Sequence, residues 1–517
     1  MRSVRVRILA TLLVLVVVGV GAWQLMPDAE ADAKPIVVGT SDVVTSLDPA
    51  GAYDAGSWGV FSNVFQTLTT YQPGSTEPVP DAAEECGFSG DDAKVYVCRL
   101  RDGLRFPSGR EMTAEDVKFS FERVLKINSE VGPASLFSTL DSVKADGKEV
   151  TFKLSSPDAT FPFKLATGAG AIVDSEVYPA EELRGGTGVD GTGRYRLVSY
   201  KEGKETVLEP NPDYRGAVDD KATPVTLRYF TDAAALDEAW KARSIDVASR
   251  ELPPETLAGM SPADPDHRVS ESDGSSTNNL VLNVRTGAPL ADPSVRKALA
   301  WMIDREKIAA KVLEGTVEPL YSLIPAGFTG HNTSFFDAFP ERDPGQAREL
   351  LRRAGVQTPV PISLGFPRVG AREKEAYELK EQLEEDGVFL VKLEGREWSA
   401  FQKDYVKGEF DAYTLGWIAD YPDPDNFSAA LIGSGNGMKN GFSDKRIDEL
   451  IRQSQSFGDR TRAVRTFEEL QNLTAEKVPV IPLWQRKEYT VTSKDVRGGQ
   501  FLNDGTGVFR LWRLGWL

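Results

Sequence analysis

One acidic side chain, Asp420, lies between two aromatic residues, Trp417 and Tyr421, in the segment LGWIADYPDPDNF (residues 415–427). A carboxylate beside aromatic rings binds a small cation such as an ammonium group, through charge-assisted hydrogen bonds and cation–π contact. The segment contains no His, Cys, Ser or Lys, the usual side chains of a nucleophilic or acid–base centre. It therefore indicates a binding site rather than a reactive centre.

The elements that position Asp420 follow from the same segment. The run FDAYTLGW, which overlaps the start of the segment, predicts a strand over residues 410–417. Pro422 and Pro424 predict a stiff loop after that strand. Asp425 has the position of an N-cap for a helix that begins near Asn426. The segment alone also fits an ordinary capped loop, so the rest of the chain must decide between the two interpretations.

The size, charge and histidine content of the chain restrict the functions that it can have. A chain of 517 residues is too long for one small core, so we expect two or three lobes. The formal net charge of -17, without a long basic tract, argues against nucleic-acid binding, which needs clustered Lys and Arg. His267 and His331 are the two histidines of the chain, so a His-based metal site is disfavoured and no cofactor is expected.

The N-terminal residues 1–33 have the pattern of a targeting segment. Three arginines in the first seven residues precede an apolar run from Ile8 to about Met26, and Ala31-Asp32-Ala33 resembles a cleavage site. The apolar run is also long enough to cross a bilayer, so two alternatives stay open: a cleaved signal peptide or an uncleaved membrane anchor. In both cases the folded part is exported, to the outer face of the cytoplasmic membrane or to the periplasm or medium.

Cys86 and Cys98 are the two cysteines of the chain. A Gly-Asp-Asp turn lies between them, and export exposes them to oxidising conditions. We expect a hairpin closed by a Cys86–Cys98 disulfide, and two free buried thiols are the alternative.

Strand-like and helix-like segments alternate along the chain, which favours an α/β fold with a mostly parallel sheet in the second half. Thr113 and Asp116 have the spacing of a capping box at the start of a helix. The chain has no G-x-S-x-G motif, no phosphate-loop lysine motif and no histidine-based constellation. These absences count against the common hydrolase and nucleotidase designs.

Seven segments of the chain together resemble one family, the extracytoplasmic solute-binding proteins of peptide- and nickel-type ABC importers. They occur in the family's order over most of the chain and are RFPSGREMTAEDVKFSFERVL, GTGRYRLVSY with NPDYRG, DPSVRKALAWMIDREKI, DPGQARELLRRAG, LGWIADYPDPDNF, NGFSDKRIDELI and VPVIPLW.

The resemblance implies an α/β fold, a two-lobed periplasmic-binding-protein-like clamshell with an additional α+β domain. It implies a discontinuous lobe I, an extra domain and a lobe II, with a hinge near residues 278 and 489. Lobe I is expected to comprise residues 34–59, 171–278 and 489–517. The extra domain is expected to comprise residues 60–170, and lobe II residues 279–488.

The resemblance also assigns roles to residues of the cleft. The position of Asp420 binds the amino terminus of a peptide in peptide-binding members, and Trp417 and Tyr421 are expected as pocket walls. A peptide carboxylate would need an arginine at the opposite end, for which Arg368 is the first candidate.

Arg372 and Arg396 are the next candidates for that carboxylate. Asn278 and Asn279 lie at the expected hinge strand and are within reach of the cleft. No catalytic residue is expected.

The sequence therefore predicts a monomeric receptor, not an enzyme, that captures a short peptide and delivers it to the permease subunits of an ABC importer. A second hypothesis keeps the fold but replaces the peptide by another solute, such as a metal chelate or an oligosaccharide. For a sugar, Trp398, Trp417 and Trp484 are candidate aromatic walls. A secreted hydrolase and a pheromone-sensing receptor are further alternatives.

Overall fold

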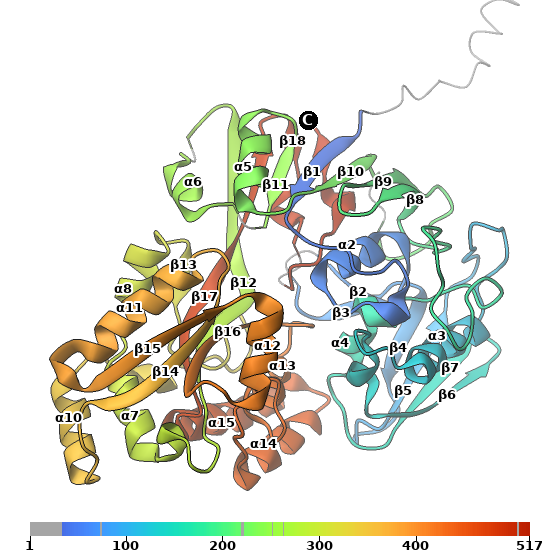
Figure 1. Ribbon diagram of the computed structural model, residues 1–517. Helices are drawn as coiled ribbons and strands as arrows, with labels where there is room; N and C mark the ends of the chain where they lie inside the picture. Colours follow the sequence, from blue (N-terminus) through green and yellow to red (C-terminus); the bar gives the residue numbers. More distant parts are fainter. Residues whose placement is uncertain (1–33, 73–74, 219–221, 251, 262, 504–505) are drawn as a thin grey trace, which may run out of the picture. The chain divides into compact units, whose positions relative to one another are not determined.

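Two long antiparallel strands, β12 (His267–Leu282) and β17 (Val480–Ser493), connect the two halves of one 11-stranded sheet. Figure 1 shows them running side by side between the two halves. The computed structural model describes residues 34–72, 75–218, 222–250, 252–261, 263–503 and 506–517. The predicted signal peptide or anchor, residues 1–33, lies outside these ranges. Within them, no helix is both long and apolar enough to cross a membrane.

The order of strands along the main path of the sheet is β15-β14-β16-β12-β17-β11-β1-β10-β9-β8. The strands on the β11 side are β1 (Ile36–Thr40), β8 (Tyr195–Lys201), β9 (Glu205–Pro210), β10 (Val225–Tyr229) and β11 (Val247–Ser249). Those on the β16 side are β14 (Val360–Pro367), β15 (Phe389–Arg396) and β16 (Ala412–Ile418), while β13 (Val317–Pro319) pairs with β17. Parallel pairing of β14 with β15 and β16, and of β1 with β10 and β11, gives the mixed sheet of an α/β fold.

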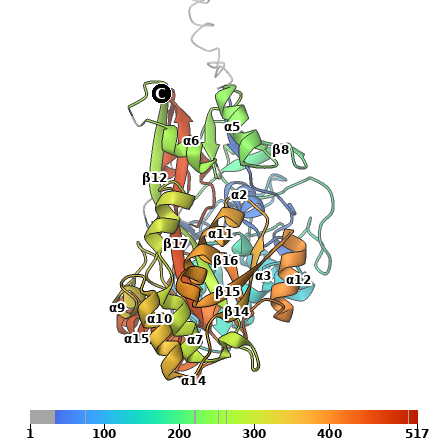
Figure 2. The ribbon, with the colours of Figure 1, turned by 60° about the vertical axis from the view of Figure 1, so that its left-hand side comes forward.

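Helices cover both parts of the sheet (Figures 1 and 2). Those of the β16 side are α7 (Pro293–Trp301), α8 (Arg305–Lys307), α9 (Ser334–Ala338), α10 (Pro344–Arg353), α11 (Arg372–Glu384), α12 (Trp398–Lys407), α13 (Asp425–Ile432), α14 (Lys445–Gln455) and α15 (Val464–Lys477). Those of the β11 side are α2 (Ala55–Val64), α5 (Ala233–Lys241) and α6 (Pro254–Gly259).

A separate four-stranded antiparallel sheet has the order β4-β5-β7-β6. Its strands are β4 (Ala83–Phe88), β5 (Val95–Leu100), β6 (Leu140–Asp146) and β7 (Glu149–Leu154), with α3 (Ala114–Ile127) and α4 (Phe161–Leu165) beside them. Two small pairs complete the fold: β2 (Thr69–Tyr71) with β3 (Pro78–Pro80), and β18 (Val496–Arg497) with β19 (Gly515–Trp516). Cys86 and Cys98 face each other across β4 and β5 and form the predicted disulfide.

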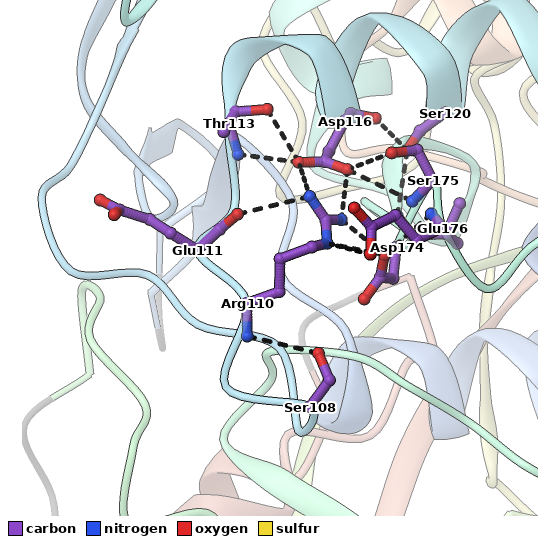
Figure 3. A network of polar contacts seen from close by, with 10 residues as sticks. Ser108, Arg110, Glu111, Thr113, Asp116, Ser120, Asp174, Ser175 and Glu176 are labelled. Carbon is purple, nitrogen blue, oxygen red and sulfur yellow. Dashed lines mark hydrogen bonds and ion pairs between the residues drawn. The ribbon is translucent and has the colours of Figure 1, made fainter.

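The predicted capping box at the start of α3 is confirmed and belongs to a larger network (Figure 3). The Thr113 amide and hydroxyl both donate to Asp116 at 2.9 Å. Arg110 donates to Asp116 at 2.5 Å and to Asp174 at 2.5 Å, so one guanidinium joins the start of α3 to the segment after residue 170. A buried ion pair of Arg123 with Asp48, at 2.6 Å, joins the same helix to the loop after β1.

The buried apolar side chains divide the molecule into two bodies. One core combines the small sheet, α2, α3, β1, β8–β10 and the C-terminal residues 496–514. On the β16 side, two further cores lie on opposite faces of the sheet, because Leu280 and Leu282 point one way and Val281 the other. We call residues 36–266 and 494–517 the first body and residues 283–479 the second body. Among the described residues, Tyr421 is the one side chain of the second body that belongs to the core of the first.

Candidate functional site

Asp420 lies two residues after the end of β16, at the boundary between the two bodies. Its Oδ2 accepts a hydrogen bond from Asn426 Nδ2 at 3.0 Å. Burial raises the pKa of the Asp420 carboxyl, and the hydrogen bond from Asn426, the hydroxyl of Tyr53 and the charge of Lys164 partly offset this rise. A cationic ligand group would hold this carboxylate in its ionised form.

Asn426 fixes both the acid and the neighbouring indole. Its Oδ1 accepts from the Asp420 amide at 3.1 Å and from Trp417 Nε1 at 2.9 Å. Trp417 is therefore held beside Asp420, as the sequence suggested. The role of Asn426 was not predicted, because the sequence placed this residue only at the start of a helix.

Tyr421 takes a position different from that of a cleft wall. It is 4% exposed, and its ring lies 6.4 Å from that of Phe163 and 6.0 Å from Lys164 Nζ in the first body. A backbone hydrogen bond of 2.8 Å from the Ala159 amide to the Gln455 carbonyl joins the bodies nearby. Tyr421 thus packs between the two bodies.

The predicted helix cap by Asp425 is wrong. Helix α13 begins at Asp425 itself, after Pro424, and has no side-chain cap. The Asp425 carboxylate instead accepts from Gln455 Nε2 at 3.1 Å, while Asp423 accepts from the Asp425 amide at 2.8 Å. Asp423 also forms a buried ion pair with Arg460 at 2.7 Å. Asp423 and Asp425 therefore stabilise the loop between β16 and α13, and the Asp425 side chain does not cap the helix.

Strand β16 has an open edge next to Asp420. It pairs with β12 along its whole length, from Ala412 to Ile418, but with β14 only at Ala412 and Tyr413. In the part of the chain that the structure describes, no strand pairs with the other edge of residues 414–418. Such an edge presents unpaired backbone amides and carbonyls to an extended chain.

A second charged group, Arg372, lies at this same end of the sheet. Its Nη1 is 3.5 Å from Glu375, its guanidinium lies 4.9 Å from the Trp484 ring centre, and its Nη2 approaches Gly416. Glu375 is fully buried and accepts from Asn278 Nδ2 at 2.6 Å and Trp484 Nε1 at 3.2 Å. Burial raises the pKa of Glu375, and the charge of Arg372 works against that rise.

The other predicted site residues are not brought together with Asp420. Asn279 is buried on the opposite face of β12 from Asn278, since neighbouring strand residues alternate, and its Nδ2 donates to Thr277. Arg368 is exposed, and Arg396 pairs with Glu394 at 2.6 Å. For a sugar site, Trp398 is 49% exposed on α12, whereas Trp484 is buried.

Two cavities adjoin this region. One, of about 30 Å³, is bounded by Asp420, Trp58, Gly168, Arg510 and Trp512. The other, of about 220 Å³, lies between the bodies beside β17 and is bounded by Arg250, Leu257, Arg372, Glu375 and Trp484, among others. Within the described residues, no cluster of His, Cys, Asp and Glu has the arrangement of a metal site.

The sequence matches the model of one family, described as bacterial extracellular solute-binding proteins, family 5 Middle, over residues 77–439. It is 28% identical over 483 residues to the probable D,D-dipeptide-binding periplasmic protein DdpA of Escherichia coli K12, covering 90% of this chain and 91% of that protein. It is also 28% identical over 506 residues to di/tripeptide-binding protein 2 of Pseudomonas aeruginosa, covering 91% of this chain and 93% of that one.

Solved structures share the fold. The Helicobacter pylori periplasmic binding protein DppA, in complex with the peptide STSA, matches with a TM-score of 0.79 and 23% identity, over 93% of this chain and 98% of that one. The dipeptide-binding protein of Pseudoalteromonas sp. SM9913, in complex with Met-Leu, matches with a TM-score of 0.79 and 20% identity, over 94% and 100% of the two chains. The fold is thus the clamshell of periplasmic binding proteins.

Proposed function

We propose that this chain, which belongs to the bacterial extracellular solute-binding proteins of family 5, captures a short peptide between its two lobes and delivers it to an ABC importer. The observation that carries the peptide assignment is the position of Asp420 at the end of the open edge of β16. An extended peptide adds to such an edge through its main chain, whatever its side chains. Its amino terminus then meets the Asp420 carboxylate, and Trp417 is a wall for its first residues.

Arg372 is the better candidate for the carboxylate end of the peptide, in place of Arg368. Its guanidinium approaches Gly416, on the open strand, and is held by Glu375 and the Trp484 ring. Arginine binds carboxylates with two parallel hydrogen bonds, which suits the free end of a peptide. Asn278 would act through Glu375, whereas the position of Asn279 on the other face gives it no direct part.

We assign residues 34–59, 171–278 and 489–517 to lobe I, residues 60–170 to the extra domain and residues 279–488 to lobe II. The shared core of lobe I and the extra domain supports their motion as one body, as do the Arg123–Asp48 and Arg110–Asp174 ion pairs. Strands β12 and β17 would then carry the hinge, near residues 278 and 489.

The receptor would act outside the cytoplasmic membrane, as a monomer, and present its cargo to permease subunits. The relatives named as dipeptide- and di/tripeptide-binding proteins support short peptides as that cargo. We also propose binding without turnover; among the described residues, the side-chain hydrogen bond to the Asp420 carboxylate comes from the amide of Asn426 and not from a nucleophile or general base, which supports this proposal.

Mass spectrometry of molecules released on denaturing the purified protein tests the peptide assignment, together with thermal stabilisation by a di- to hexapeptide library. A ligand that binds the folded state raises the melting temperature, so no shift with any library member contradicts a peptide receptor. Replacing Asp420 by Ala should weaken binding of free-amine peptides and leave N-acetylated ones unaffected. Equal losses for both would contradict the ammonium role.

A non-peptide solute is the second candidate, and the Agrobacterium tumefaciens protein AgaA, in complex with agropinic acid, matches this fold with a TM-score of 0.78 and 21% identity. The cavity beside β17, with Arg372 in its wall, is the candidate site for such a molecule. The released ligand separates the two, because a peptide fragments into a series of amino-acid residues in the mass spectrometer and a sugar or other non-peptide solute does not.

A further inference from the structure

Glu488 lies on β17, in the wall of the cavity of about 220 Å³ between the two bodies. Its side chain is 6% exposed, and within the described residues its carboxylate has no hydrogen-bond or ion-pair partner. A buried carboxylate without a partner costs free energy, because it loses contact with water and gains no interaction in return. Glu488 therefore indicates a ligand that supplies the missing cation.

The neighbouring strand leaves room for this carboxylate. The pairing of β12 with β17 is interrupted by a bulge, in which residues 274–276 stand opposite Arg486 alone. A Cβ at Gly274 would lie 2.9 Å from Glu488 Cγ and 3.2 Å from Glu488 Oε1. Glycine at this position therefore leaves the space that the Glu488 side chain occupies.

The other charged side chains of the cavity wall each have an interaction partner. Their ion pairs are Arg250–Asp42 at 3.0 Å, Arg372–Glu375 at 3.5 Å and Lys487–Glu318 at 2.6 Å. Arg486, which is also part of the wall, interacts with another group too. These pairs leave the Glu488 carboxylate as the charge of the wall that a ligand must neutralise.

Apolar side chains form much of the rest of the wall. Leu252 and Leu257 come from the first body, and Leu313 and Val317 come from the second. Lysine and arginine side chains have the same division, with an apolar stem and a charged end. One water molecule needs roughly 10–15 Å³ of such space, so the cavity of about 220 Å³ has room for a long side chain.

We propose that this cavity receives the side chain of the last residue of the peptide, and that Glu488 makes the receptor selective for lysine or arginine there. The position follows from Arg372, which lies in the wall and approaches Gly416 on the open edge of β16. A peptide with its amino terminus at Asp420, the proposed ammonium anchor, and its carboxylate at Arg372 has its last side chain beside the cavity. This inference rests on the proposed function and adds the class of peptide that is bound.

The experiment measures the affinity of wild type for Ala-Ala-Lys, Ala-Ala-Arg, Ala-Ala-Leu and Ala-Ala-Glu by titration calorimetry. Ala-Ala-Lys acetylated on the side-chain amine keeps the apolar stem and loses the charge. We expect the lysine and arginine peptides to bind roughly tenfold to a hundredfold more tightly than the other three, which is the usual effect of a hydrogen bond between charged groups. Lys-Ala-Ala, with its charge at the other end, should gain nothing over Leu-Ala-Ala.

Glu488→Gln should abolish this preference and bind Ala-Ala-Leu as wild type does, which also shows that the variant folds. Glu255→Gln is the matched control and should keep the preference, because Glu255 is an exposed acid on α6, outside the cavity wall. Equal affinity of wild type for the lysine peptide and its acetylated form would overturn the role of Glu488. A preference that survives in Glu488→Gln would overturn it as well.

The result also separates this inference from the proposed function. If wild type binds the peptides without distinction, the selectivity fails and the peptide receptor stands. If wild type binds none of them, the inference fails, and the di- to hexapeptide library then decides whether the proposed function fails with it.

Discussion

Asn426 and Asp420 are joined by two hydrogen bonds that run in opposite directions. The Asn426 amide donates to the Asp420 carboxylate at 3.0 Å and accepts from the Asp420 backbone at 3.1 Å. Both the carboxylate and the chain that carries it are thereby fixed by one side chain, which is itself 5% exposed. The anchor is preformed within the second body, so ordering it costs little when a ligand arrives.

Replacing Asn426 by Ala should therefore damage recognition more than its size suggests. The substitution removes a donor from Asp420 and an acceptor from Trp417 Nε1. We expect roughly tenfold weaker binding of free-amine peptides and a changed Trp fluorescence spectrum, with stability lowered by about 1–3 kcal/mol. Titration calorimetry and thermal unfolding measure both effects.

Asn283→Ala serves as the control for that variant. Asn283 is 4% exposed and donates to the Gly408 and Phe410 carbonyls, at the far end of β12 from the cleft. It should lower stability to a similar degree without changing affinity. A similar loss of affinity in both variants would mean that Asn426 acts through stability alone.

The buried carboxyl of Asp425 should make the free energy of unfolding fall as the pH rises. Burial and the charge of Asp423 raise its pKa from 3.8 to about 6, although Lys164, Arg460 and Gln455 act in the other direction. Between about pH 4 and pH 6, Asp425 therefore keeps its proton in the folded state but loses it in the unfolded state. Stability from this group is present below about pH 4 and is lost as the pH rises to about 6, by up to about 3 kcal/mol.

Asp425→Asn should therefore raise the free energy of unfolding at pH 7 and flatten its change between pH 4 and pH 6. Thermal unfolding at several pH values measures this. Asp444→Asn is a contrast of opposite sign: burial acts on Asp444 too, but Lys477 and the amides at the start of α14 lower its pKa. Asp444 contributes stability that is lost as the pH falls. An unchanged pH profile in Asp425→Asn would contradict the assignment.

Local signals in the sequence predicted the parts of the fold that depend on near neighbours. Thr113 and Asp116 are three residues apart, and their capping box forms as expected. The hairpin between Cys86 and Cys98 is similarly local. Asp425 failed as a cap because its carboxylate meets Gln455, a residue 30 positions away.

The site depended on contacts that the sequence does not display. Asn278 donates to Glu375, 97 positions away in the chain, and no spacing rule connects them. Arg368 and Arg372 both follow strand β14. Arg372 is the first residue of α11, and its side chain contacts Glu375 and Trp484. The carboxylate in LGWIADYPDPDNF was visible in the sequence because its chemistry is local, whereas its partners required the folded chain.

The Cys86–Cys98 disulfide should stabilise the small sheet without affecting binding. It closes a loop with a sequence separation of 12 residues, for which the gain in stability is typically about 3 kcal/mol. Reduction by dithiothreitol should lower the melting temperature and leave peptide affinity unchanged. A Cys86→Ala/Cys98→Ala variant should match the reduced protein and not respond to dithiothreitol. A loss of affinity on reduction would mean that the small sheet also shapes the cleft.

Tyr421 should stabilise the closed arrangement of the two bodies. It is 4% exposed and packs into the core of the first body, with its ring beside Phe163 and Lys164. Tyr421→Ala removes this contact, which buries an aromatic side chain worth about 2–3 kcal/mol. We expect a larger radius of gyration in small-angle scattering and at least tenfold weaker peptide binding.

Tyr405→Ala is the control for Tyr421→Ala, because Tyr405 packs within the second body, beside Phe401 and Tyr413. It should lower stability but leave the radius of gyration of the folded protein unchanged. If Tyr421→Ala keeps wild-type dimensions and affinity, this contact does not control closure. If only affinity falls, Tyr421 acts on the ligand rather than on the arrangement of the bodies, which is the role that its place beside Asp420 in the sequence first suggested.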